Sequence, residues 1–519
     1  MIPRVLIPII AVAIVVALAI FGYTSRSPLV HSMLVLVPLV LMLMGRIGLI
    51  FGLVLALRYS DLIIPGLPQG LNLMDVVILF LVGMILARHT ITKEKFVKWR
   101  LSHYMIVGFF CVLLIVIAIR GIGIRFLGSS EWGGFTYIKI FISIAFYLVC
   151  GRLRLSEKHV KMGLVLMLLL STFPAVAQAV FYFSGGTIFF QYMFLEAYAS
   201  GMLATLDAMQ RDAGAARFYF TGMAGSLVIV ALAFFPLNSR SRVFFALFWL
   251  TGFFVTLLSG FRAATVGIVV TTLMFLWVYY PTRRGLIMTS SVVAFVGLLI
   301  GLAPFINNLP TGVQRALSWV PWYDIPLAIK MDAAISTEWR LIVWQQALRM
   351  LPEYLLLGRG LTFNASEVQA ALALRDTVSW AYLSHNYHNG PLAILITTGI
   401  PGAVIFIVFT IAVSMEAVQG GAAMRRQCNS PFLVRVYLVF MVYLLYAILS
   451  FFLIYGDMNS SVPNLLFLAA TLQVLRLNFA PASGAAVVGA EPSSYHPLPE
   501  GQRTLLPHAA TQALRGSAS

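Results

Sequence analysis

Charged side chains are scarce in this chain. Asp, Glu, Lys and Arg make up 10% of its 519 residues, whereas 60% are hydrophobic, and the mean hydropathy is +0.93. Soluble domains carry about 25% charged residues, because a soluble fold must cover its outside with polar groups. The scarcity of charge excludes a soluble protein. It also argues against a nucleic-acid-binding domain, in spite of the net charge of +17.

Cysteines and metal-binding patterns are also few. The three cysteines, Cys111, Cys150 and Cys428, show no Cys-x-x-Cys spacing, so a disulfide framework is not expected. His385 and His388 are three residues apart, but no Cys or carboxylate lies near them to complete a zinc site. No metal and no cofactor is therefore expected.

Long apolar runs dominate what is present. A run of about 20 residues crosses roughly 30 Å of hydrocarbon as a helix, and an all-α, polytopic integral membrane protein of about 12–14 transmembrane helices is predicted. The first run lacks a clear signal-peptide cleavage site and is taken as an uncleaved span. The predicted spans are 3–23, 29–45, 47–60, 73–89, 103–120, 136–152, 159–183, 217–236, 241–259, 262–280, 285–305, 390–414, 432–455 and 461–476.

The basic residues between these runs predict the orientation. They form five clusters, which all fall on one side if every predicted span is real, and an excess of Lys and Arg marks the cytoplasmic side. Both termini are then cytoplasmic. The clusters are Arg88 to Arg100, Arg152 to Lys161, Arg240 with Arg242, Arg283 with Arg284, and Arg425 with Arg426.

Two long segments, 184–216 and 306–388, fall on the other side. The second is the largest polar region and is predicted to be a helical loop within a membrane domain of residues 1–476. Within it a helix is expected from Ser336 to Leu351, capped by Ser336 or Thr337 and stopped by Pro352, before a turn at 358–360. The tail, 477–519, is rich in Ala, Gly, Pro and Ser and is predicted to be disordered and cytoplasmic.

Three motifs surround this loop. His388-Asn389 is followed by nine residues and then by Gly399-Ile-Pro-Gly402; Ser259-Gly-Phe-Arg262-Ala263 precedes a span; Arg340 and Trp344 lie in the loop helix. In their order along the chain, these motifs resemble the O-antigen ligase / O-antigen polymerase family, bacterial inner-membrane glycosyltransferases that use undecaprenyl-diphosphate-linked glycans. The resemblance covers roughly 240–415, and the N-terminal half is similar only in having many spans.

The residue chemistry agrees with the resemblance. Arginine provides forked, permanently charged donors for a departing diphosphate, which suits Arg262 and Arg340. Histidine accepts a proton near neutral pH, so His388 is the candidate general base for an attacking sugar hydroxyl. The absence of any Asp-x-Asp favours a metal-independent mechanism. His385 and Asn389 are candidate supporting residues, and Trp344 is a candidate for stacking on a sugar.

Each residue also has a plain structural interpretation. Arg262 could be a snorkelling anchor at a helix end, Arg340 part of a solvated helix face, His388 an interfacial histidine paired with Asn389, and Trp344 a membrane-interface anchor.

The resemblance implies inverting glycan transfer at the periplasmic face of the bacterial inner membrane. The partners would be an undecaprenyl-diphosphate-linked glycan, an acceptor glycan, membrane lipid and other polysaccharide-assembly proteins. Polymerisation of lipid-linked repeat units, as in O-antigen or exopolysaccharide, is favoured. A ligase acting on lipid A core and a protein O-oligosaccharyltransferase remain open. A polysaccharide flippase is the alternative from another class, but transporters place ionisable groups and broken helices at mid-membrane.

Overall fold

The structure is a computed structural model that describes residues 47–58, 72–92, 99–124, 131–183, 221–234, 239–374 and 376–480. These residues form helices and, apart from one isolated bridge between Trp132 and Phe363, no extended pairing. The predicted spans 3–23 and 29–45, the segment 184–216 and the tail from 481 onward lie outside the described residues.

The helices follow the predicted apolar runs, except that α17 continues to Gln427, 13 residues beyond the predicted span 390–414. Those in or between the predicted spans are α3 (Ile47–Leu57), α4 (Leu73–Thr92), α5 (Leu101–Arg120), α6 (Gly134–Val149), α7 (Glu157–Phe183), α9 (Thr221–Phe234), α10 (Ser239–Leu258), α11 (Arg262–Tyr279), α12 (Arg284–Leu302), α17 (Gly390–Gln427), α18 (Pro431–Leu453) and α19 (Ser461–Phe479). Among the described residues, eight helices are long and apolar enough to cross a membrane. The prediction of an all-α polytopic membrane protein is confirmed.

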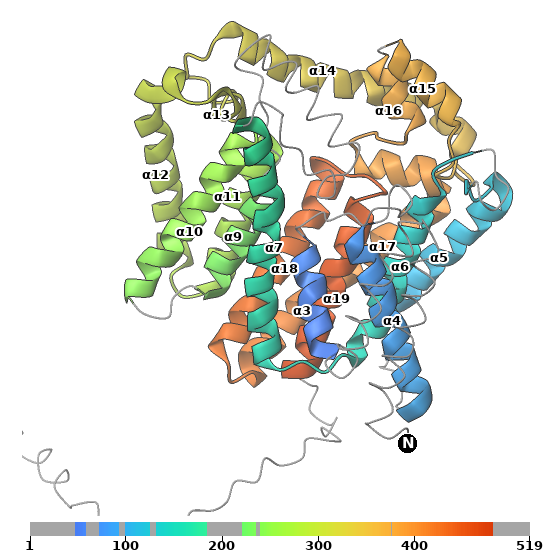
Figure 1. Cartoon of the computed structure of the whole chain (residues 1–519), viewed down its shortest axis with the longest axis horizontal. Coiled ribbons are helices and arrows are strands. Elements are labelled where there is room, and N and C mark those ends of the chain that lie inside the picture. Colours follow the sequence, from blue (N-terminus) through green and yellow to red (C-terminus); the bar gives the residue numbers. More distant parts are fainter. Residues whose placement is uncertain are drawn as a thin grey trace, which may run out of the picture. The chain divides into compact units, whose positions relative to one another are not determined.

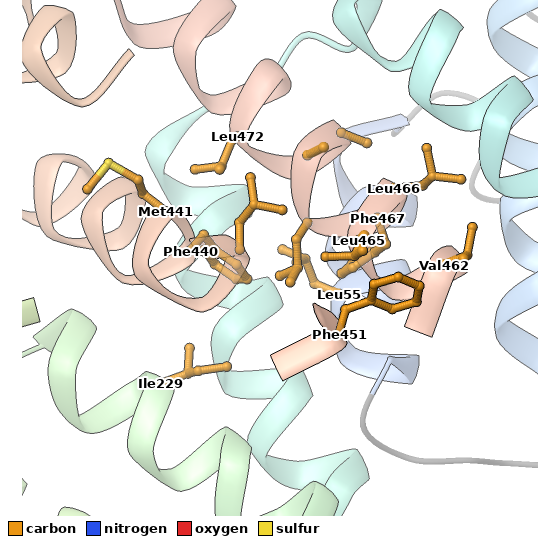
Figure 2. Close-up of a cluster of buried hydrophobic side chains, with 14 of the residues drawn as sticks. Leu55, Ile229, Phe440, Met441, Phe451, Val462, Leu465, Leu466, Phe467 and Leu472 are labelled. Atoms are coloured by element: carbon orange, nitrogen blue, oxygen red, sulfur yellow. The ribbon is translucent and has the colours of Figure 1, made fainter. Parts of the chain in front are cut away.

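The core contains residues of α3, α9, α18 and α19, with α18 packed against both α9 and α19. Figure 2 shows Leu55 of α3 close to Phe467 of α19, with Phe440 of α18 and then Ile229 of α9 further away, and all four are buried. α3 also approaches α7 so closely that a Cβ on Gly163 would lie 2.9 Å from the Cα of Gly52. Small residues allow such close approach between helices in lipid.

α12 differs from the central helices. Few of its side chains are buried, and Leu286, Val293 and Ile300 are exposed. Apolar side chains exposed along a helix of this length are what a lipid-facing span requires. α12 therefore lies at the edge of the bundle, where it leads into the large loop.

The large loop folds into helices, as predicted. They are η3 (Ala303–Asn308), α13 (Thr311–Ala316), α14 (Leu327–Met350), η4 (Leu351–Tyr354), α15 (Ala365–Ala373) and α16 (Thr377–Leu383). α14 runs across the ends of the spans from the α13 side to the α16 side (Figure 1) and contacts α13, α16 and α17.

The predicted start of the loop helix was wrong. α14 begins at Leu327, after Pro326, so Ser336 and Thr337 lie in its interior and cap nothing. Proline before the first turn sets the helix entry, and the ion pair between Arg315 of α13 and Asp332 holds the additional turns in place. The end is as predicted, because the α-helix stops at Met350, just before Pro352.

Where the structure describes them, basic residues between the spans make contacts at the end of the bundle away from this loop. Arg100 pairs with Glu416, Lys161 lies over the ring of Phe432, and Arg425 donates to the carbonyl oxygen of Val278. These contacts join segments that the charge pattern predicted to lie on one side. The large loop lies at the opposite end, against the start of α17.

Candidate active site

The loop ends at a tight turn that positions His388. Both His385 and His388 have positive φ angles, 59° and 51°, which histidine adopts only at a cost. The side-chain oxygen of Asn389 then accepts a hydrogen bond from the backbone N–H of Leu392 at 3.1 Å and caps α17. The cap and the turn fix the backbone on both sides of His388.

The imidazole of His388 is half-buried between two aromatic rings. Its centroid lies 5.3 Å from that of Trp339, edge to face, and 4.9 Å from that of Tyr455. Among the described residues, no polar group hydrogen-bonds to its buried Nδ1. The ring is thus held by packing rather than by a hydrogen bond at Nδ1.

The surroundings of His388 favour its neutral form. Burial lowers its pKa to about 4, the positive charge of Arg340 acts in the same direction, and the negative charge of Asp457 opposes them. A neutral imidazole at neutral pH can accept a proton.

Arg262 and Arg340 come together through α14. Arg262 is the first residue of α11, and its Nη2 donates to the carbonyl oxygen of Ala333 at 2.9 Å. Ala333, Thr337 and Arg340 follow one face of α14 because they are spaced by four and three residues. One face of α14 therefore carries Arg340 and also the carbonyl group that binds Arg262.

The two guanidiniums lie close enough to interact. The pKa of Arg340 is lowered by burial and then by the positive charge of Arg262, with Tyr455 opposing. Since His388 also feels the charge of Arg340, the structure brings together the three residues that the sequence singled out. Two like charges that act on one another in this way create a place that favours an anion.

The tryptophans of α14 have different positions. Nε1 of Trp344 donates to the carbonyl oxygen of Tyr387 at 2.8 Å and so holds the backbone next to His388. Trp339, five residues before Trp344, is the one against the imidazole. Stacking of Trp344 on a sugar stays a prediction.

His385 lies in the interior of the loop. Its Nε2 is 3.1 Å from the carbonyl oxygen of Thr362, and its Nδ1 is 3.4 Å from the hydroxyl of Tyr387. Pairing with a carbonyl makes Nε2 the donor, and burial lowers the pKa to about 3, so the ring is neutral. None of these contacts is with His388. The supporting role of His385 therefore stays a prediction.

The connection between α18 and α19 completes the surroundings and was missed in the sequence. Asp457 is buried, and its carboxylate accepts hydrogen bonds from the backbone N–H groups of Ser460 and Ser461 and from the hydroxyl of Ser460. An Asp followed by serines before an apolar run does predict a helix cap. This sequence pattern does not predict that the carboxylate of Asp457 acts on His388.

A break in α17 links the site to the membrane. Gly399 has φ 70° and ψ −175°, which interrupts the helix nine residues after its start. The loop fills the break: the backbone N–H groups of Arg359 and Gly360 donate to the carbonyl oxygens of Ile396 and Thr397, and that of Ile400 donates to Leu355. A Cβ on Gly399 would lie 2.7 Å from the carbonyl oxygen of Leu356, which explains the glycine.

A cavity of about 290 Å³ lies beside the site among α11, α18 and α19. Tyr455, which packs on His388, forms part of its wall, and Gly267 and Thr271 line it further along α11. Nε of Arg58 donates to Asn464 at 3.0 Å, and both residues line the cavity. Within the described part of the chain, no group of three or more His, Cys, Asp or Glu side chains is arranged to hold a metal ion.

These features define a class of protein: a multi-pass helical membrane protein with two arginines and a neutral histidine at one end of its spans, under a helical loop. Residues 245–407 match the family model described as O-antigen ligase. The match includes all the predicted site residues and supports the resemblance of this region to the O-antigen ligase / O-antigen polymerase family. None of the curated proteins compared with the chain matches it significantly. The family supports glycan transfer of the ligase or polymerase type.

Proposed function

We propose that the chain transfers a glycan from undecaprenyl diphosphate to an acceptor sugar hydroxyl at the periplasmic face of the bacterial inner membrane. Polymerisation of lipid-linked repeat units is the favoured reaction. The observation that carries the proposal is the convergence of Arg262, Arg340 and His388, which come from three separate segments, at one end of the spans. An anion and a hydroxyl are the groups that such a set of side chains suits.

His388 has the role of general base in this proposal. Its neutral imidazole takes the proton from the acceptor hydroxyl as that oxygen attacks the anomeric carbon of the donor. The bond from this carbon to the diphosphate breaks, and the configuration inverts. Trp339 and Tyr455 hold the ring, and the charge of Asp457 stabilises the imidazolium that forms.

Arg262 and Arg340 hold the diphosphate. Their charge stabilises the leaving group as negative charge accumulates on its oxygens, without a requirement for a metal ion. The contact of Arg262 with Ala333 fixes the distance between α11 and α14, so the two guanidiniums bind as one unit. The neighbouring cavity has the space for a group of the donor.

The way in which the break in α17 is closed supports an enzyme over a flippase. Transport sites use the free backbone groups of broken helices to bind their cargo. Here the carbonyl oxygens of Ile396 and Thr397 already accept hydrogen bonds from the loop. The backbone groups at the break therefore bind the loop, and the loop carries the residues of the site.

The test is an assay with purified full-length protein, an undecaprenyl-diphosphate-linked glycan and a chelator. We expect the wild type to lengthen or transfer the glycan with chelator present, and the anomeric configuration of the product to be inverted relative to the donor. Loss of activity on chelation, restored by Mg²⁺, would overturn the metal-independent mechanism. Offering lipid-linked repeats, lipid A core or a protein acceptor separately distinguishes polymerase, ligase and protein glycosylation.

Orientation is tested separately. A reporter that is active only outside the cytoplasm should be active when fused within the loop near residue 345, and inactive when fused near residue 95 or 500. The reverse pattern would place His388 on the cytoplasmic side, away from the proposed donor.

A further inference from the structure

A second polar cluster lies at the other end of α17. Arg100, His103, Glu416, Gln473 and Arg476 surround a cavity of about 30 Å³, room for about two waters at 10–15 Å³ each. Glu416 lies 17 residues after the break at Gly399, or about 26 Å along the helix at 1.5 Å per residue, and His388 lies before the break. This cluster is therefore separate from the His388 site.

The carboxylate of Glu416 is bound mainly to neutral groups. Its Oε1 accepts from the hydroxyl of Ser102 at 2.7 Å, and that hydroxyl accepts from Tyr147 at 2.8 Å. Its Oε2 lies 3.8 Å from Nη1 of Arg100, too far for a good hydrogen bond. The ion pair between Arg100 and Glu416 is loose.

Arg476 has a donor to spare. Its Nη1 is buried and, within the described part of the chain, meets no hydrogen-bond acceptor. The stem of the side chain packs against α17, where a Cβ on Gly420 would lie 3.2 Å from Cδ of Arg476. Burying a charged N–H group without an acceptor is unfavourable. Two guanidiniums against one carboxylate also leave one positive charge in the cluster.

The cluster lies beside aromatic residues typical of a membrane interface. Trp99 and Tyr104 are exposed, and their rings meet at 5.3 Å, edge to face, on either side of the α5 start. Exposed Trp and Tyr gather at the depth of lipid headgroups. Arg100 lies between them in the sequence, so the cavity is expected at headgroup depth.

We propose that this cavity binds one phosphate-class anion through the guanidiniums of Arg476 and Arg100. Forked guanidinium donors match phosphate oxygens, and the spare N–H group of Arg476 supplies a directed bond. Glu416 disfavours a second negative charge, so the ligand is a monoanion: a phospholipid headgroup phosphodiester or singly charged inorganic phosphate. Bound there, the anion joins α5 to α19 through one ligand. Basic pockets between membrane helices bind lipid headgroups in this manner.

The experiment uses full-length protein purified in a neutral detergent and depleted of lipid. The probes are phosphatidylglycerol, a diacylglycerol with the same acyl chains, and inorganic phosphate. Bound lipid is counted by native mass spectrometry, and the midpoint of thermal unfolding is followed during each titration. The variants are Arg476→Gln and Arg476→Lys. Arg426→Gln is the matched control, because Arg426 is an exposed arginine at the same end of α17 but outside the cavity.

We expect phosphatidylglycerol to raise the unfolding midpoint of the wild type and of Arg426→Gln, and diacylglycerol to leave it unchanged. Arg476→Gln should bind phosphatidylglycerol about 10-fold or more weakly, the usual effect of losing a charged hydrogen bond, and Arg476→Lys should lie between. An equal effect of inorganic phosphate would identify a soluble anion as the ligand.

Equal binding by wild type and Arg476→Gln, or binding of neither probe by the wild type, would overturn the proposal. If Arg476→Gln does not fold, Arg100→Gln and Arg476→Lys give the same comparison. The measurement needs no glycan donor, so its outcome is independent of the proposed glycan transfer.

Discussion

The two ends of α17 hold polar groups in different ways. At the loop end, Arg262, Arg340 and His388 come from segments far apart in the sequence and are positioned by backbone contacts, a strained turn and aromatic packing. At the opposite end, Glu416 is tied to Ser102 and Tyr147 by a chain of side-chain hydrogen bonds.

The difference indicates which end is suited to chemistry. A general base must change its protonation state, and the imidazole of His388 is held by aromatic packing, with no hydrogen bond at Nδ1 from the described residues that would fix its protonation state. A binding site needs only a fixed arrangement of donors, and the hydrogen-bonded network supplies that. Substitutions at the loop end should therefore affect turnover, and those at the opposite end should affect stability and ligand retention.

The largest effect is expected from His388→Ala. Removing the base should lower the transfer rate by about 10²- to 10⁴-fold, the usual contribution of proton transfer, while insertion and donor binding persist. The measurement is turnover of purified protein at saturating donor. His385→Ala should affect turnover less, because His385 bonds to Thr362 rather than facing the site. A wild-type rate for His388→Ala would show that the loop end of α17 does not supply the general base.

Arg262→Ala and Arg340→Ala come next. Each removes charged hydrogen bonds to the proposed diphosphate, and roughly a 10- to 100-fold loss of kcat/KM is expected for each. Arg→Lys at either position should retain part of the activity, since the charge remains but the fork is lost. Arg426→Ala, at the opposite end, is the control and should transfer glycan normally. Normal products from Arg262→Ala at normal protein level would exclude it from the site.

Gly399→Ala should act on stability. The substitution forces a Cβ into a left-handed backbone conformation and against the carbonyl oxygen of Leu356, and a loss of about 1–3 kcal/mol is expected. Gly83→Ala in α4 is the matched control, because a Cβ there meets nothing within 4 Å, and alanine favours a helix. Thermal unfolding in detergent measures both. Equal midpoints would show that the loop does not depend on the break.

The smallest effect concerns pH. His388 acts as a base only when neutral, so kcat/KM should hold from pH 7 downward and fall as the pH drops through about 4, its lowered pKa. Asp457→Asn removes the charge that raises this pKa but keeps an oxygen for the cap, so the acid limb should move to lower pH. The pH profile of each variant, fitted for the acid limb, gives the result. A shift to higher pH would contradict the proposed role of Asp457.

Most of the membrane spans could be predicted from the sequence because the lipid environment restricts which segments can cross it. A span must satisfy its own backbone groups and be apolar for about 20 residues, and α5, α11 and α18 begin and end within a few residues of the predicted limits. The loop was harder, since its helices are amphipathic and short. The start of α14 depends on Pro326 and on an ion pair with α13, neither of which hydrophobic periodicity reveals.

Only those site residues that belong to local sequence motifs were predicted. His388 and Arg262 lie at or next to helix starts and belong to recognisable motifs, and Arg340 was singled out by the family resemblance. Trp339, Tyr455 and Asp457 join the site only through tertiary packing. Tyr455 and Asp457 also lie beyond the matched region of 245–407. No local pattern connects the α18–α19 turn to a histidine so far before it in the chain.

The break at Gly399 has a consequence for biosynthesis. A bare interruption in a membrane helix would expose backbone groups to hydrocarbon. The segment that covers it, Leu355 to Gly360, precedes the break in the chain and so leaves the ribosome first. The cover is therefore made before the groups that it must satisfy. Moving this segment to a position after α17, by circular permutation, would leave the helix to insert with its interruption uncovered.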